Sequence, residues 1–410
     1  LFVGRFSAAT VPQVQTQVQR TIEYERSQQA GAAWYHKGMG VASNQGPGDD
    51  GEYDNVHVDN IRADLLGFTY TLVDQIYDYT GTASDVTNGL NDGRSVINYT
   101  GHGSTTSWGS TGYSVSHVNA LVNDNKLPFI IAVACVNGQF TYSTCFAEAW
   151  MRATNGSEPT GAIGTYMSSI NQSWNPPMDA QDEIADLLVG TAATGTKRTF
   201  GGLCYNGSSH MMDVYGGDGE DMFLTWHIFG DPSLRVMTDT PQALTVTHGT
   251  NIDAFASTFD VTVGVPDALV ALYHDGVSYG SALTGPGGAA TIDIAGPLPE
   301  NADITVTVTA FNALTYVGST HSGGAYMPMI SVDPMFFDKE MAPDEILADS
   351  LLIENVGDPL SVLHYDIEVV AAGAGASAFA SGRMNTGVPS EGQGRAWLEL
   401  TSPTAVSYTH

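Results

Sequence analysis

The chain has 410 residues, 42% of them hydrophobic and 10% aromatic, which is the composition of a folded protein with room for two or three domains. Its 44 acidic residues against 14 basic ones give a formal net charge of −30, a field that repels nucleic acids and anionic membranes and excludes both as expected partners. No stretch of about 18 consecutive apolar residues occurs, so no membrane span is expected.

The first 239 residues alternate predicted strands and helices. The chain begins inside a predicted strand over 1–6, and we therefore interpret the sequence as a fragment of a longer precursor. A capping pattern at Thr10 precedes a predicted helix of about 18 residues, whose Val14, Val18 and Ile22 are expected to pack against the core. The alternation predicts an α/β fold with a mostly parallel sheet covered by helices on both faces. The other predicted strands cover 38–43, 69–76, 95–99, 129–134, 160–167 and 199–205, and the other predicted helices cover 56–67, 85–91, 115–122, 146–153 and 221–227, with one more around Ile184, Leu187 and Leu188.

Helical periodicity ends at Thr240-Pro241. Short stretches with period-2 alternation follow, and Gly- and Pro-rich turns separate them. They predict an all-β, immunoglobulin-like sandwich over 240–322. Renewed alternation predicts a further β-rich domain over 323–410, whether complete or truncated. The Ala-, Gly- and Ser-rich tract 371–381 within it is expected to be a flexible loop.

Two neighbouring strands each end in a residue suited to nucleophilic catalysis. Strand 95–99 runs into His102, and strand 129–134 runs into Cys135. Ligands of an open α/β sheet bind beyond the carboxyl ends of the strands, which lie about 4.8 Å apart, so these side chains are expected side by side. A thiol beside an imidazole is the arrangement of a cysteine nucleophile and its general base. Gly103 permits a close backbone approach, and its N–H with that of Cys135 is expected to face an oxyanion.

Each of these residues also has a simpler interpretation. Cys135 is then a small buried side chain, as free cysteines often are, and His102 a residue that hydrogen-bonds within a turn. Those interpretations leave it unexplained that both polar residues end adjacent strands at the same edge. The catalytic interpretation explains both positions at once.

Seven blocks of the sequence stand out, in the order GRFS (4–7), NYTGHGS (98–104), NKLPFIIAVACVNG (125–138), CFAEAWMRA (145–153), INQSW (170–174), KRTFGG (197–202) and FGDPSL (229–234). These blocks resemble the gingipain family of secreted cysteine peptidases, within the caspase-like group. The resemblance implies a caspase-like fold over 1–239 and endopeptidase activity, with Cys135 as the nucleophile and His102 as the base. It also implies that a preceding part of the catalytic unit is absent from this chain or was separated by processing.

The same resemblance implies a specificity site for arginine at P1. Asp54, in the stretch GEYD (51–54), matches the carboxylate at the floor of the S1 site in arginine-selective members. Trp174 and Met178 match its walls, with Gln172 and Thr100 nearby. An aromatic face against a guanidinium, with a carboxylate at its end, is physically coherent. On the residues alone, the favoured interpretation of Asp54 is that it is one more solvated acid.

One position departs from the family pattern. Arginine-selective members place a glutamate near the catalytic histidine, and Gln45 stands at the matching position. Either a neighbour such as Asp49 or Asp50 substitutes for the glutamate, or His102 is less basic here. No cofactor is required by the expected chemistry. The acids of 44–54 leave a structural calcium ion open, although their spacing does not match an EF-hand loop. The remaining cysteines and two further histidines are expected to be structural: Cys145, Cys204, His117 and His227.

The sequence therefore predicts a secreted cysteine endopeptidase that acts on protein or peptide substrates, with cleavage after arginine. The alternatives are a non-catalytic adhesin or scaffold that retains the peptidase fold, and a caspase-like peptidase of different P1 specificity.

Overall fold

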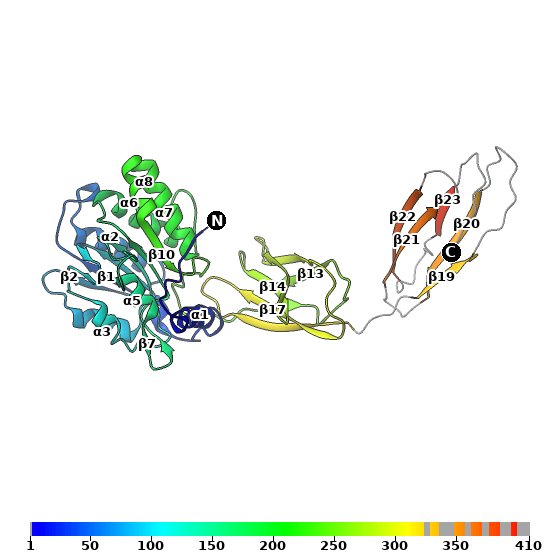
Figure 1. The fold of residues 1–410 in the computed structure, drawn as a ribbon, viewed down its shortest axis with the longest axis horizontal. Helices are drawn as coiled ribbons and strands as arrows, with labels where there is room; N and C mark the ends of the chain where they lie inside the picture. The colour runs from blue at the N-terminus through cyan, green and yellow to red at the C-terminus, as the bar shows by residue number, and fades with distance from the viewer. Residues whose placement is uncertain are drawn as a thin grey trace.

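The computed structural model describes residues 2–323, 329–335 and 348–356, and the strands 362–370, 377–385 and 395–399. Its first part is built on a six-stranded sheet with the order β10-β9-β6-β3-β1-β2 (Figure 1). All neighbours are parallel except β10, which runs antiparallel to β9. The strands are β1 (Lys37–Ala42), β2 (Leu72–Tyr77), β3 (Val96–Thr100), β6 (Phe129–Val133), β9 (Gly164–Ser168) and β10 (Trp226–Gly230).

Helices cover both faces of this sheet because its central strands are apolar on both faces. Along β6, Phe129 and Ile131 belong to one core, whereas Ile130 and Ala132 belong to the other. The first core is closed by α2 (Asp54–Phe68), α6 (Asn175–Val189), α7 (Phe200–Tyr215) and α8 (Gly217–Thr225), and the second by α3 (Ala83–Asp92), α4 (Val115–Val118) and α5 (Phe146–Arg152). The predicted α/β class is confirmed. Short elements complete this part: η1 (Ala33–His36), η2 (Asp49–Gly51), β4 (Gly103–Ser104), β5 (Ser107–Trp108), β7 (Thr154–Asn155) and β8 (Glu158–Pro159).

The helix expected after Thr10 is α1 (Val11–Arg26), but the predicted packing face is wrong. Val14, Val18 and Ile22 are exposed by 40–45%, whereas Gln17 and Arg20 are buried. The Arg20 guanidinium donates hydrogen bonds to three carbonyl oxygens at and beyond the end of α5. These hydrogen bonds stabilise the observed orientation of α1 more than burial of the three aliphatic side chains would stabilise the opposite one. These acceptors are the carbonyls of Trp150 (3.1 Å), Ala153 (3.2 Å) and Ala162.

Four other predicted elements differ from the structure. Residues 199–205 are not a strand but the start of α7, where the Thr199 side chain accepts the N–H of Gly202 (3.2 Å). The helix expected over 221–227 ends at Thr225, and β10 follows it directly. In the expected strand 1–6, the described residues form only a parallel bridge from Arg5 to Phe229. The helix expected over 115–122 is a single turn, α4.

A β-sandwich follows the α/β part, as the change of pattern at Thr240 predicts. Its two sheets enclose one apolar core, and Arg235 ties it to the α/β part by donating to the carbonyls of Thr309 (2.8 Å) and Asp267 (2.9 Å). One sheet has the order β11-β13-β16 and the other β12-β18-β17-β14-β15. The strands are β11 (Thr247–His248), β12 (Asn251–Ile252), β13 (Thr258–Thr262), β14 (Leu269–His274), β15 (Val277–Leu283), β16 (Ala289–Asp293), β17 (Ala302–Thr309) and β18 (Tyr316–Ser322).

Further antiparallel strands lie beyond residue 323, in agreement with the predicted β-rich region. The expectation of a loop over 371–381 is wrong for 377–381, which pair in a strand, and 371–376 lie outside the described residues. Among the described helices, none combines the length and the apolarity needed to cross a lipid bilayer. These last strands are β19 (Ile330–Asp333), β20 (Ala348–Asn355), β21 (Val362–Val370), β22 (Ser377–Asn385) and β23 (Arg395–Glu399).

Candidate active site

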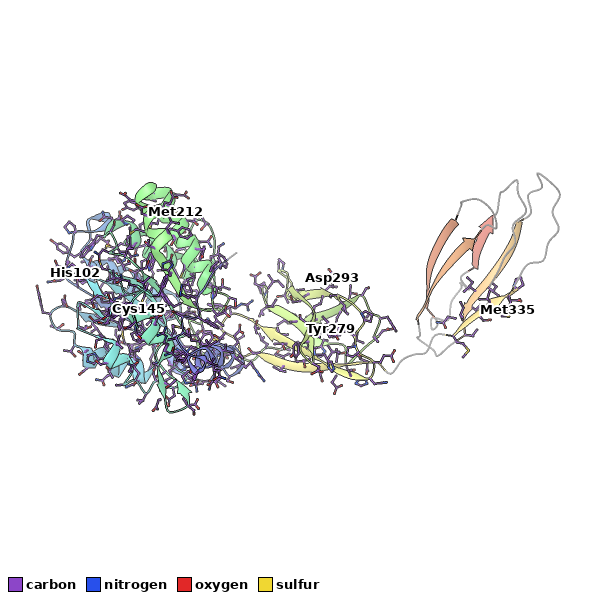
Figure 2. All side chains as sticks on the ribbon, viewed as in Figure 1. His102, Cys145, Met212, Tyr279, Asp293 and Met335 are labelled. Carbon is purple, nitrogen blue, oxygen red and sulfur yellow. The ribbon has the colours of Figure 1, made fainter. Side chains whose placement is uncertain are left out.

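The register of the sheet brings His102 and Cys135 to the same level. Val96 pairs with Phe129 and Thr100 with Val133, so partners on β3 and β6 are 33 residues apart. The residue numbers 102 and 135 differ by the same 33, and each residue lies two positions beyond the end of its strand. His102 is exposed and Cys135 half-buried, so both face the solvent edge of the sheet. Figure 2 shows His102 at the periphery of the α/β part, whereas Cys145 lies well inside it.

The loop after β3 folds back onto the backbone of Cys135. A Cβ atom added to Gly103 would lie 2.5 Å from the carbonyl oxygen and 3.0 Å from the amide nitrogen of Cys135, so only glycine fits here. The His102 carbonyl accepts the Tyr99 hydroxyl (2.6 Å) and the Gly109 N–H (2.7 Å), which fixes the loop. The backbone of Gly103 therefore lies against the backbone of Cys135. The oxyanion role of their N–H groups stays a prediction.

A second loop, 170–174, runs along Cys135 on the side of β9. The Val136 N–H donates to the Ile170 carbonyl (2.9 Å), and Cys135 Sγ lies 3.9 Å from the Gln172 carbonyl oxygen. The Gln172 side chain is buried and its Oε1 accepts the N–H of Ala134 (3.0 Å). Gln172, which we expected near the S1 site, therefore braces the residue before the candidate nucleophile.

Asp54, Trp174 and Met178, which we call the S1 cluster, come together from two helices. Asp54 is buried at the start of α2, and its Oδ1 accepts the indole N–H of Trp174 (2.7 Å), while its Oδ2 accepts the Ser43 hydroxyl. Trp174 precedes α6, and its ring stands edge-on to His102 with centroids 5.1 Å apart. Met178 is buried in α6, and a Cβ on Gly48 would clash with both Met178 and Trp174. The structure thus brings the three predicted specificity residues together beside His102.

Two carboxylates act electrostatically on His102. Burial raises the pKa of Asp54 and outweighs the hydrogen bonds from Ser43 and Trp174 and the charges of His57 and His102, which lower it. Burial and the charge of Asp54 also raise the pKa of Asp78, and His102 opposes that rise. Asp78 follows β2, and its N–H donates to the Ala42 carbonyl (3.0 Å). Asp54 and Asp78 therefore both lie close enough to His102 to interact with it electrostatically.

The two acids that we considered as substitutes for the family's glutamate have other surroundings. Asp49 accepts the hydroxyl of Tyr215, and Asp50 is exposed on a turn with φ of 52°. Gln45 is exposed, and its side-chain amide lies 3.4 Å from Asn44 Oδ1. Its main-chain carbonyl accepts the N–H of Asp54 (2.9 Å), so Gln45 shapes the loop that leads into α2.

Thr100 does not line the S1 cluster as we expected. It is fully buried, and its hydroxyl donates to Oε1 of Gln181 (2.7 Å), on the side of the sheet that α6 covers. Because Thr100 is the last residue of β3, this bond fixes the strand end from which His102 projects. Its role is therefore to support the site.

Cys145, Cys204, His117 and His227, which we expect to be structural, are buried or held by hydrogen bonds. Cys145 is buried at the start of α5, where burial raises its pKa to about 12, and Cys204 is buried in α7. Nδ1 of His117 accepts the Ser114 N–H (3.1 Å), and Nε2 of His227 lies 3.0 Å from the Ser169 hydroxyl. Within the part of the chain that the structure describes, no three His, Cys, Asp or Glu side chains gather as metal ligands.

Sequence reasoning missed two polar residues beneath the S1 cluster. His57 and Gln181 are fully buried, and His57 Nε2 lies 3.0 Å from Gln181 Oε1. A signal was present, because both residues occupy the apolar stripe of their helix. In α2 the buried stripe is Asp54, His57, Ile61 and Leu65, and in α6 it includes Met178, Gln181, Ile184 and Leu188.

The sheet and the strand-end pair define an α/β protein with a cysteine–histidine site. A profile described as "Peptidase family C25" matches residues 1–237, and one described as "Peptidase family C25, C terminal ig-like domain" matches 247–322. The chain belongs to peptidase family C25, which confirms the resemblance to the gingipains.

Known proteins agree with this assignment. Gingipain R2 of Porphyromonas gingivalis is 40% identical over 337 residues, which are 81% of this chain and 46% of that protein. The crystal structure of the Arg-specific cysteine proteinase gingipain R superposes with a TM-score of 0.76 at 40% identity, covering 78% of this chain and 75% of that one. A complex of pro- and mature domains of the Porphyromonas gingivalis enzyme gives 0.75, also at 40% identity, over 78% and 77% of the two chains. The chain spans 46% of the length of gingipain R2 and 33% of the length of gingipain R1, both from Porphyromonas gingivalis.

Proposed function

We propose that this protein is a cysteine endopeptidase that cleaves after arginine. The observation that carries the proposal is the common register of His102 and Cys135, two residues beyond the ends of adjacent parallel strands. His102 takes the thiol proton, and the Cys135 thiolate attacks the carbonyl carbon of the scissile bond. The backbone N–H groups of Gly103 and Cys135 stabilise the oxyanion. The imidazolium then protonates the leaving amine, and water activated by His102 hydrolyses the thioester.

The S1 cluster supports arginine as the P1 residue. Asp54 is buried, so its charge is little screened, and a guanidinium can pair with it through two hydrogen bonds. Trp174 offers an aromatic ring beside that carboxylate. The related gingipain R structure is described as Arg-specific, and it is 40% identical to this chain over the superposed part. The proposed chemistry requires no cofactor, since the thiolate and the backbone N–H groups supply the nucleophile and the oxyanion donors.

Two further proposals concern the cellular setting. We propose secretion, to the medium or the cell surface, in keeping with the strongly acidic composition. We also propose that a separate or cleaved N-terminal segment completes the catalytic unit. This rests on the share of the relatives that the chain spans and on the complex of pro- and mature domains formed by the related enzyme.

The test is a panel of fluorogenic peptides with Arg, Lys or Asp at P1, together with labelling by an arginyl chloromethyl ketone. We expect turnover of the Arg peptide and a mass increase on the peptide that contains Cys135. Cys135→Ala should abolish both, whereas Cys204→Ala, at a buried cysteine far from the sheet edge, should retain both. No turnover and no label on Cys135 would favour a scaffold that retains the fold. Turnover confined to Lys or Asp would favour a peptidase of different specificity.

A further inference from the structure

A buried polar network lies beneath the S1 cluster, centred on Gln181 of α6. Its Oε1 accepts the Thr100 hydroxyl (2.7 Å) and faces His57 Nε2 (3.0 Å). Its Nε2 donates to Asn98 Oδ1 (3.2 Å) and to the Ile131 carbonyl (3.2 Å). This amide therefore joins α2, α6, β3 and β6, the four elements that lead to Asp54, Met178, His102 and Cys135.

The network fixes the proton on one nitrogen of His57. The Ile131 carbonyl can only accept a hydrogen bond, so the Gln181 atom that faces it must be the NH₂ group. The Oε1 atom on the other side must then accept from His57, which requires a proton on Nε2. His57 is fully buried, so no solvent group supplies an alternative.

The other ring nitrogen of His57 faces carboxylates. Nδ1 lies 3.3 Å from Asp182 Oδ2 of α6 and 3.9 Å from Glu52 Oε2 of the loop before α2. Nδ1 has no hydrogen-bond partner among the described residues, so its contact with Asp182 is described as an ion pair. An unprotonated Nδ1 would direct its lone pair at the oxygens of Asp182 and Glu52, so this geometry favours a proton on Nδ1 in addition to the one on Nε2, which makes the ring an imidazolium. Burial, the largest influence, lowers the pKa of His57, but Asp182, Gln181 and Glu52 together raise it above its ordinary value, in the same direction as the geometry.

This cation lies one helical turn from the specificity carboxylate, because Asp54 and His57 are three residues apart in α2. We propose that His57 is a positioning residue for the S1 cluster: as a buried imidazolium it keeps Asp54 ionised and in place for an arginine side chain. Without the charge of His57, the burial that already disfavours the ionised form of Asp54 is opposed only by the hydrogen bonds from Ser43 and Trp174 and by His102. The inference rests on the proposed arginine specificity and names a residue that touches no substrate.

The test compares wild type and His57→Gln by kcat/KM against pH, with Arg and its neutral isostere citrulline at P1. We expect the acid-side midpoint for the Arg substrate to rise by about one pH unit, which makes kcat/KM about tenfold lower below that midpoint. The citrulline profile and the alkylation of Cys135 by iodoacetamide depend on Asp54 only through its charge near His102, so their midpoints should move less than the Arg midpoint. Asp182→Asn should move the Arg midpoint in the same direction by a smaller amount. Asp213→Asn, which removes an exposed acid from α7, should leave it unchanged.

A second measurement reads the charge of Asp54 without turnover. The ¹³Cγ signal of Asp54, assigned by its loss in Asp54→Asn, should titrate at higher pH in His57→Gln and in Asp182→Asn than in wild type. An unchanged Asp54 titration, or an equal loss with Arg and citrulline substrates at all pH values, would overturn the inference. A shifted titration in a protein that cleaves no Arg peptide would instead refute the proposed function and leave the link between His57 and Asp54 intact.

Discussion

Replacing Asp54 by asparagine tests the specificity site with little disturbance of the fold. The oxygen of the introduced amide can still accept the indole N–H of Trp174, and its NH₂ group can donate to the Ser43 hydroxyl, so both hydrogen bonds of the carboxylate have equivalents. Because burial raises the pKa of Asp54, folding disfavours the ionised form of this side chain. Replacing the carboxylate by a neutral amide should therefore not lower the free energy of unfolding. The charge is therefore the main property that Asp54→Asn removes.

The loss of that charge sets the size of the effect. A hydrogen bond to a charged group is worth about 1.5–3 kcal/mol, which corresponds to a loss of about 10- to 150-fold in kcat/KM for an Arg substrate. Since Asp54 also acts on His102, part of the loss should appear with a citrulline substrate, and the ratio of the two substrates isolates the S1 contribution. Steady-state kinetics and a thermal melt measure both quantities. An unchanged Arg-to-citrulline ratio would refute the role of Asp54 in specificity.

Three further predictions follow from other contacts. Cleavage after arginine should decline on acidification at a pH where an ordinary aspartate is still ionised, because Asp54 is protonated as the pH falls through its raised pKa; a midpoint shared with a citrulline substrate would argue against this. Gly103→Ala should lower kcat about 100-fold in a folded protein, because the added Cβ would lie 2.5 Å from the Cys135 carbonyl oxygen. Gly67→Ala, where the added Cβ meets nothing within 4 Å, should keep wild-type activity. Equal kcat values for the two variants would show that the loop after β3 moves to accommodate the Cβ without loss of activity. Arg20→Met should lower the free energy of unfolding by about 3 kcal/mol in a urea titration, because three carbonyls lose a hydrogen bond from a charged donor, although those of Trp150 and Ala153 keep a backbone N–H. The exposed Arg26→Met serves as the control, and equal stabilities of the two variants would contradict the prediction.

The strand-end pair could be predicted from the sequence because parallel strands constrain it strongly. The apolar runs before His102 and Cys135 are continuous and β-branched, which places them in the centre of a sheet. When two such strands are parallel neighbours, the residues that follow them lie at the same edge of the sheet, and this does not depend on where the covering helices begin and end. The S1 cluster could not be reached in this way, since Asp54, Trp174 and Met178 lie near helix starts, and their assignment depended on the family resemblance.

The wrong predictions share a physical cause, which is that tertiary contacts outweighed local pattern. Val14, Val18 and Ile22 recur with true helical spacing, so the pattern predicts the helix correctly. It does not predict which face of the helix is buried, because that is decided by the hydrogen bonds of the Arg20 guanidinium. Residues 199–205 contain β-formers and two glycines, yet they start a helix. Further along that helix, Gly207 lets α7 approach α6 so closely that a Cβ there would lie 2.8 Å from the Ala180 carbonyl oxygen.

The buried network explains how a specificity site on α2 and α6 is held in place relative to a reaction centre that follows β3 and β6. The strand ends are fixed by the sheet ladder, but α2 and α6 can shift over the apolar face that they cover, since apolar contacts are not directional. Gln181 replaces part of that apolar contact with directed hydrogen bonds to β3 and β6, and His57 connects α2 to the same amide. The distance from Asp54 to the reacting bond is then set by polar contacts of defined length. Substitutions in this network should therefore change the preference for arginine more than the reactivity of Cys135 toward a small alkylating agent.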